Sequence, residues 1–186
     1  MQTRVERYLA HLDDLSGGQE PKFTPFRSTK PGMRDVTAIV YHDFPKPGFV
    51  TGLTYGLSLS GHSCWTRSTP ELCISVRSTD DAWAWAIAYL AERLRGGDCH
   101  FAYGDTIGFG ERISKESDMD AFVLSTPAGL AEEDFLGIDV GDDLPVTIIG
   151  CYPIHSSERR FIQDNGLDAF RDLDWDPYDV TRATVV

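Results

Sequence analysis

Residues 71–95 read ELCISVRSTDDAWAWAIAYLAERLR, and this stretch decides the fold. Its first seven residues alternate, with Leu72, Ile74 and Val76 on one side, which predicts a β-strand with one face on a core. From residue 80 to 95 the apolar period changes to that of an α-helix. A strand and a helix with apolar faces in adjacent segments predict a helix packed on a sheet, in an α+β domain.

The sequence indicates where the expected helix at 80–95 begins and which of its faces are buried. Ser78 or Thr79 can cap its N-terminus, because a side-chain oxygen there accepts from a free backbone N–H. Since Trp85 and Tyr89 lie away from the centre of the apolar stripe, we expect the helix to be covered on more than one side. The stripe itself consists of Trp83, Ile87, Leu90 and Leu94.

Working outward, residues 2–16 repeat apolar side chains at helical spacing and predict an N-terminal helix. Residues 19–34 carry three prolines and no period, so an irregular connection is expected there. Successive strands favour antiparallel pairing, so we expect a largely antiparallel or mixed sheet with flanking helices. The remaining expected elements are strands at 36–44, 49–59, 120–125, 134–140 and 145–152, short extended pieces within 100–119, and helices at 156–165 and 167–173; no structure is assigned to the acidic tail at 174–186.

Composition limits the function. A chain of 186 residues that is 41% apolar fits one domain over 1–186, and no run is long enough for a membrane span. The net charge of −12, with 17 unclustered basic residues, argues against nucleic acid and favours a basic protein partner, although solubility alone would also explain it. The charged N-terminus lacks a signal peptide, so a cytoplasmic location and reduced thiols are expected. The cysteines are Cys64, Cys73, Cys99 and Cys151, spaced too widely for a metal site.

Two further segments could carry chemistry. Residues 103–110 are glycine-rich, but no lysine and no helix follow, so a tight turn fixed by Asp105 is expected in place of a phosphate site. His155 and Glu158 stand three apart, as an acid/base pair or two metal ligands do. The alternative is that they begin a helix, with Glu158 in its first turn. Neither a metal nor another cofactor is expected, because further ligands are missing.

Several strings together resemble the suppressor-of-fused domain in its compact bacterial form. The resemblance covers about residues 35–171 and leaves the helix at 2–16 and the tail at 174–186 as extensions. Each string alone is weak, but their order and spacing are specific. The strings are Thr54-Tyr55-Gly56-Leu57-Ser58, Glu71-Leu72-Cys73-Ile74, Leu90-Ala91-Glu92-Arg93-Leu94, Gly104-Asp105-Thr106-Ile107, Phe122-Val123-Leu124-Ser125-Thr126-Pro127 and Ile148 through Glu158.

The resemblance implies a single mixed α/β domain with no known catalytic residues and no obligatory cofactor. The related animal protein restrains a zinc-finger transcription factor by binding a peptide from it, using a second domain that this chain is too short to contain. Bacterial relatives include immunity proteins that bind and silence a cognate toxin domain. A non-catalytic protein-binding module, immunity-type or regulatory, is therefore the leading hypothesis.

The resemblance also implies where a partner binds. The family's Gly-Asp contact falls on Gly104 and Asp105, next to Thr106, and an aromatic contact near the end of the preceding helix falls on Arg93. We therefore expect a partner surface at this loop and at the helix end, with Glu92 beside Arg93. The competing hypotheses are a small-ligand or hydrolase pocket at Asp105, Tyr152, His155 and Glu158, and a structural scaffold that binds no other protein.

Overall fold

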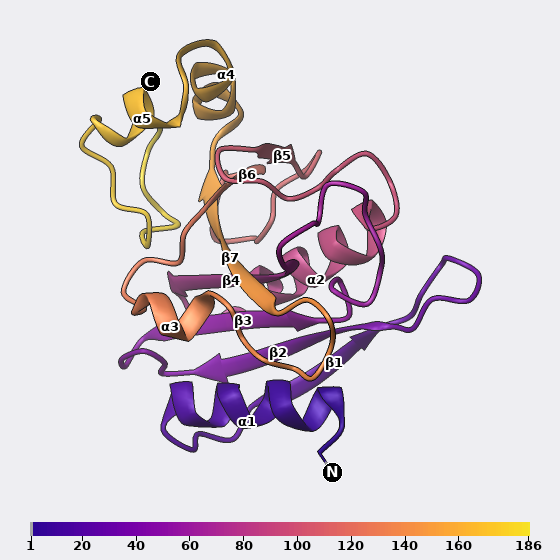
Figure 1. The fold of residues 1–186 in the computed structure, drawn as a ribbon. Helices are drawn as coiled ribbons and strands as arrows, with labels where there is room; N and C mark the ends of the chain where they lie inside the picture. Colours follow the sequence, from indigo (N-terminus) through magenta and orange to yellow (C-terminus); the bar gives the residue numbers. More distant parts are fainter. Residues whose placement is uncertain (1) are drawn as a thin grey trace.

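The computed structural model describes residues 2–186 and contains one seven-stranded mixed sheet (Figure 1). Its strand order is β1-β2-β3-β4-β7-β6-β5, and all neighbours are antiparallel except β4 and β7, which are parallel. The predicted α+β class and mixed sheet are confirmed. The strands are β1 (Lys22–Phe26), β2 (Val36–His42), β3 (Phe49–Tyr55), β4 (Thr69–Arg77), β5 (Thr106–Gly108), β6 (Ala121–Ser125) and β7 (Val146–Ile154).

The stretch at 71–95 forms β4 and the helix α2 (Ala82–Leu94), as its periods predict. The alternating side chains of β4 and the apolar stripe of α2 belong to one buried cluster. Gly52 of β3 lets the helix approach closely, since a Cβ at this position would lie 2.4 Å from the Ala84 Cβ. The cluster contains all but one of the side chains predicted from the sequence, and the partly buried Leu94 packs against it; the buried members are Leu72, Ile74, Val76, Trp83, Ile87 and Leu90.

The start of α2 differs from the prediction. Its N-cap residue is Asp81, whose side chain makes no capping hydrogen bond. The Asp80 carboxylate accepts from the N–H of Ala82 at 3.0 Å, and Ser78 Oγ accepts from the N–H of Asp80 at 2.9 Å. The side chains of Ser78 and Asp80 therefore each accept a hydrogen bond from a backbone N–H near the start of the helix, and Thr79 does not cap it.

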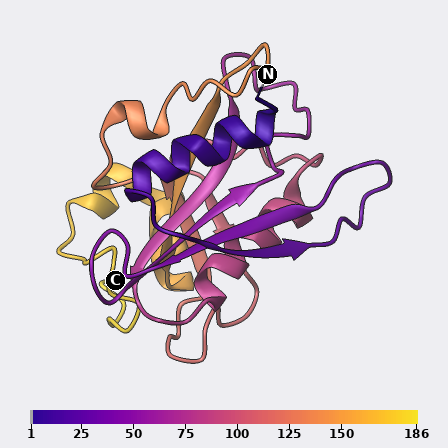
Figure 2. The same ribbon diagram turned by 90° about the horizontal axis from the view of Figure 1, so that it is seen from below.

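The other face of the sheet is covered by α1 (Arg4–Ser16), which ends at Gly17 in the left-handed conformation (Figure 2). The predicted helix at 2–16 is confirmed in this form. Tyr8 and Leu12 are its buried side chains, and they pack on Leu53 and Ile148 in a second cluster. Both faces of β4 are consequently buried.

This double coverage also buries a carboxylate. Glu71, on the α1 side of β4, is fully buried, and its oxygens accept from Thr54 Oγ1 at 2.6 Å and from the N–H of Gly56 at 2.8 Å. Ser58 donates to it from Oγ at 2.5 Å and from its N–H at 3.1 Å. Arg4 of α1 reaches the same hydroxyl, at 2.8 Å. The carboxylate thus joins β3, the following turn and α1.

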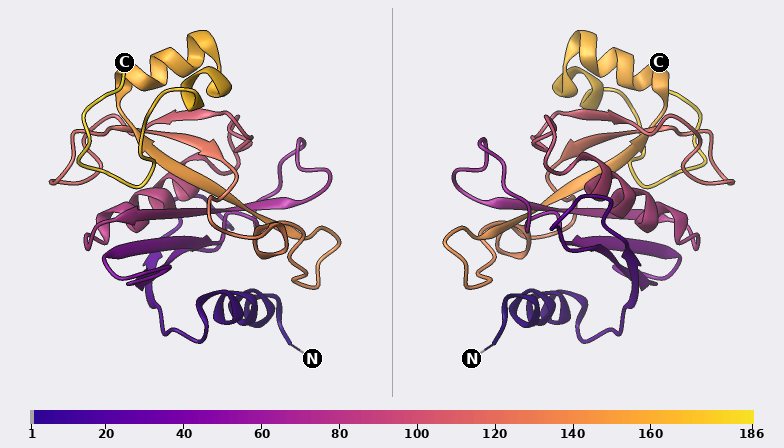
Figure 3. Two further views of the ribbon diagram at one scale, coloured as in Figure 1. Left: turned by 90° about the vertical axis from the view of Figure 1, so that its left-hand side faces the viewer. Right: turned by 90° about the vertical axis from the view of Figure 1, so that its right-hand side faces the viewer.

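The helices after β7 lie at the far end of the molecule, opposite α1 (Figure 3). The helices α4 (Ser156–Asn165) and α5 (Leu167–Arg171) match the two predicted there. Ile154, Ile162 and Phe170 join β6 residues in a third buried cluster. The tail after them forms no helix or strand, yet Val180 is buried in the main core. The division into a core at 35–171 and two extensions remains a prediction.

Two segments differ from the prediction. The connection at 19–34 contains an edge strand, β1. Its residues are mostly exposed and include Pro25, so the sequence shows no alternation of apolar and polar residues there. The strand expected at 134–140 is wrong, because the short helix α3 (Glu132–Phe135) occupies its start. Only Ile138 bridges to β7, and Ile138 and Val140 pack under α1 as irregular chain.

Smaller differences concern strand ends. Strand β3 stops at Tyr55, not at 59, because Gly56 turns the chain with φ 128°. Strand β7 continues past 152 to Ile154, and β2 ends at His42. No helix in residues 2–186 combines the length and apolar character that crossing a membrane requires.

Candidate protein-binding site

Residues 104–106 lie where the chain enters β5, the strand at one edge of the sheet. The carboxylate of Asp105 accepts from the N–H of Ala102 at 2.9 Å, and the Asp105 N–H donates to the Ala102 carbonyl at 3.1 Å. These bonds close a tight turn in which Gly104 has φ 85°. Asp105 therefore fixes its own turn, while its side chain stays partly exposed.

Strand β7 changes neighbours halfway along its length, so its first half has a neighbouring strand on one side only. Residues 146–150 pair with β4, whereas β6 pairs only with the second half of β7. On the β6 side of the first half, a single bridge joins Val146 to Ile138. Because backbone groups alternate in direction along a strand, the N–H and C=O of Ile148 face this gap. No strand fills it in the part of the chain that the structure describes, and we call it the β7 notch.

The β7 notch opens into a groove of about 350 Å³. The groove is lined on one side by Tyr103 and on another by Leu136, two of the most exposed large apolar side chains, at 51% and 47%. Thr147 also lines it, and its buried hydroxyl has no hydrogen-bond partner within residues 2–186. A strand edge without a neighbouring strand, beside exposed apolar side chains, can accept an added peptide strand once the side chains that cover the buried Ile148 move.

The expected exposure of Glu92 is wrong. Its side chain is 5% exposed, forms an ion pair with the buried Arg95, and accepts from the N–H of Thr29 at 2.8 Å. The segment before β2 folds back over this end of α2, so Glu92 is closed off from a partner. Arg93 is exposed, and its guanidinium donates to the Tyr89 hydroxyl at 2.7 Å. Its role as a contact remains a prediction.

The first turn of α4 confirms the helix-start interpretation and closes the alternative pocket. The carboxylate of Glu158 accepts from the N–H of His155 at 2.9 Å. Glu158 is fully buried, and the guanidinium of Arg182 from the tail binds both of its oxygens. Burial alone would raise the pKa of Glu158, but the bonds from Arg182 and His155 hold that pKa below its usual value. The carboxylate is therefore occupied by the chain itself and is closed to a ligand.

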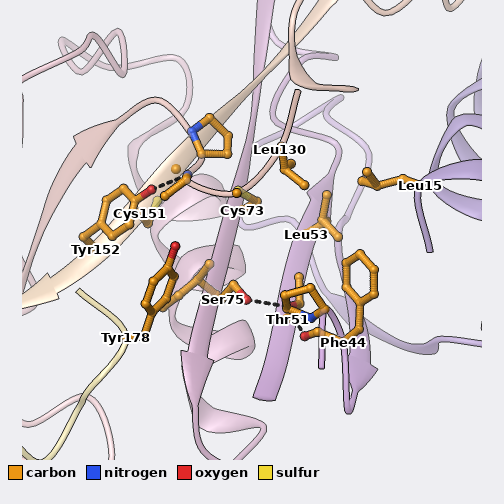
Figure 4. A pocket seen from close by; sticks show the side chains of 16 residues that line it. Leu15, Phe44, Thr51, Leu53, Cys73, Ser75, Leu130, Cys151, Tyr152 and Tyr178 are labelled. Atoms are coloured by element: carbon orange, nitrogen blue, oxygen red, sulfur yellow. Dashed lines mark hydrogen bonds between the residues drawn. The ribbon is translucent and has the colours of Figure 1, made fainter. Parts of the chain in front are cut away.

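Tyr152 borders a different, apolar pocket between β3, β4 and β7 (Figure 4). Its hydroxyl is already used, since it donates to the Thr126 carbonyl at 2.8 Å and accepts from the N–H of Ala128 at 2.6 Å. Burial raises the pKa of the Cys73 thiol in this pocket to about 12, so that thiol stays protonated at neutral pH. Neither side chain is an activated acid, base or nucleophile.

We expect the purified protein to contain no stoichiometric transition metal. Within residues 2–186, no three His, Cys, Asp or Glu side chains gather as ligands, and a closed zinc site needs four. Elemental analysis of untagged protein purified without chelator checks this. One equivalent of zinc per chain, lost on His155→Ala, would contradict it.

The fold and the site together define a class of protein. It is a single α+β domain on one mixed sheet, with an unpaired strand edge beside exposed aromatic side chains. The sequence model of the suppressor of fused protein family matches residues 33–183. The chain belongs to that family, which is known for protein–protein interactions.

Solved structures show the same fold. A suppressor of fused homolog from Neisseria gonorrhoeae FA 1090 matches with a TM-score of 0.75 at 17% identity, over 97% of this chain and 95% of that one. The Sufu–Fu complex matches at 0.69 and 12% identity, over 98% and 92%. Drosophila Suppressor of Fused matches at 0.69 and 12% over 96% of this chain, which spans 50% of that protein. Comparison with curated protein sequences gave no significant match.

Proposed function

We propose that the chain is a non-catalytic protein-binding domain that takes up an extended segment of its partner in the β7 notch. The unpaired edge of β7 carries this proposal, together with the exposed Tyr103 and Leu136 beside it. Ile148 is fully buried in the free chain, so the side chains over it must move before a partner strand pairs its own N–H and C=O with those of Ile148, between the bridge at Ile138 and the β6–β7 pair at Gly150. Tyr103 and Leu136 would pack against its side chains.

The charge of the chain indicates the kind of partner. A net charge of −12 steers a basic protein or basic peptide toward the domain and raises the association rate. The loop at 104–106, which carries the carboxylate of Asp105, continues directly from Tyr103, a lining residue of the groove. We propose a regulatory or immunity-type role in the cytoplasm, in which the bound partner, for example a toxin domain, has its working surface blocked.

A site-specific crosslink tests where a partner binds. A photoreactive amino acid at Leu136 is expected to capture one stoichiometric protein from native lysate. The control places the same group at Phe23 on β1, which is 53% exposed and stands at the opposite edge of the sheet. Capture of the same protein from both positions, or from Phe23 alone, would reject the notch as the site.

Asp105→Asn separates a contact role from a purely structural one. As a contact, Asp105 contributes charge at the partner surface, so the variant should bind more weakly and with less dependence on salt. As a structural group it holds only its turn, and losing a charged hydrogen bond would cost about 1.5–3 kcal/mol of stability. We expect lower affinity with a thermal midpoint close to that of the wild type, because the amide oxygen of Asn can still accept from the N–H of Ala102 and keep the turn. A destabilised variant whose folded fraction binds normally would remove Asp105 from the interface.

A further inference from the structure

The last residues of the tail are held on residues 155–158, at the start of α4, by hydrogen bonds and by the packing of Val185 on the third cluster. Arg182 binds Glu158 with both of its terminal nitrogens, one of them at 2.8 Å. The N–H of Val185 donates to the same carboxylate at 3.1 Å, and the hydroxyls of Thr184 and Ser157 lie 2.8 Å apart. Three of these contacts converge on one buried acid, and His155 Nε2 also lies 3.1 Å from the Arg182 carbonyl.

Contacts that do not involve Arg182 hold the residues to which it binds. The N–H of His155 orients the Glu158 carboxylate, and Ser156 Oγ donates to Asp120 at 2.6 Å, which fixes the turn. The ring of Trp175 lies 5.2 Å from the Arg182 guanidinium and packs on Phe170 at 4.8 Å between centroids. A buried carboxylate beside an aromatic ring is a binding site for arginine.

The tail is anchored upstream of this site. The N–H of Arg77 donates to the Tyr178 carbonyl at 2.9 Å, and the side chain of Val180 is buried in the main core. Residues after Val180 can therefore leave the site while the main core keeps its packing, at the loss of the contact of Val185 with the third cluster. The fit of the tail is also incomplete, because the buried Nε of Arg182 has no hydrogen-bond partner within residues 2–186.

We propose that Glu158 and Trp175 form an arginine-binding site that Arg182 occupies in cis, and that an arginine-bearing extended segment of a partner protein displaces residues 181–186 from it. A segment without arginine would leave Glu158 buried and unpaired, which is costly, so the site selects for arginine. A lysine cannot replace it, since an ammonium group lacks the planar fork that binds both carboxylate oxygens. This surface is separate from the β7 notch and goes beyond the proposed function.

The probe is a fluorescent peptide, TRATVV, that copies residues 181–186. The full chain carrying Arg182→Ala should bind it at least about tenfold more tightly than the wild type, whose own arginine competes. The same peptide with Arg182→Lys should bind at least about tenfold more weakly than TRATVV, because it lacks the bidentate fork. A folded variant that does not bind TRATVV, or that binds both peptides equally, overturns the proposal.

A second measurement uses the wild-type chain and covers the case in which Arg182→Ala fails to fold. With the protein labelled in ¹⁵N, millimolar TRATVV should shift the amide resonance of Val185 to the position of a free chain. The lysine peptide at the same concentration should leave that resonance in place. If TRATVV leaves it in place as well, the tail is a fixed part of the fold and the proposal is overturned.

Discussion

Replacing Glu71 with alanine is expected to lower the free energy of unfolding by about 3–5 kcal/mol. The carboxylate is fully buried and accepts four hydrogen bonds, from Thr54, Gly56 and the two donors of Ser58. Its removal leaves these donors without an acceptor in a site that water does not reach. The Ser58 hydroxyl, which accepts a hydrogen bond from Arg4, would also lose the carboxylate to which it donates. Chemical denaturation followed by circular dichroism measures the loss.

The same substitution at Glu133 is the matched control for Glu71. Glu133 is exposed on α3, so its replacement should change stability by less than about 0.5 kcal/mol. Equal effects of the two substitutions would show that the buried acceptor contributes nothing. Glu71→Gln is informative as well, because an amide keeps the shape but cannot accept from donors at both ends.

Leu90→Ala is expected to cost about 2–5 kcal/mol, because it opens a cavity between α2 and the sheet. Leu90 is 3% exposed and belongs to the cluster that contains Leu72 and Ile74 of β4. The thermal midpoint and the denaturation midpoint should both fall. Leu136→Ala, at a leucine that is 47% exposed, is the matched control and should leave both midpoints nearly unchanged. An unchanged midpoint in Leu90→Ala would mean that α2 does not pack as described.

Segments with a strong period were predictable from the sequence, and segments that gain structure only from their neighbours were not. The strand β4 and the helices α1 and α2 each carry a complete apolar pattern. Strand β1 carries none, because it is an exposed edge that pairs on one side only. Residues 138–140 alternate like a strand, but their apolar side chains pack under α1 with a single bridge to β7.

The candidate site was predicted less well, for a physical reason. Alternation places Glu71 on the outer side of its strand, and helical spacing places Glu92 at an open helix end, yet other segments bury both. The β7 notch depends on where β6 stops beside β7, and no local pattern encodes that. The position of Arg182 on Glu158 likewise joins segments far apart in the chain. The turn at Gly104-Asp105 depends only on neighbouring residues, and the sequence predicted it correctly.

The parallel pair in the middle of the sheet has a consequence for synthesis of the protein. Strand β4 pairs with β7, and roughly 70 residues separate the two in the sequence. At usual elongation rates, several seconds pass between the appearance of β4 and that of its partner. During that interval the nascent half-domain presents the edge of β4 with unpaired N–H and C=O groups, a template for aggregation. We expect the growing chain to need a chaperone most between residues 77 and 146.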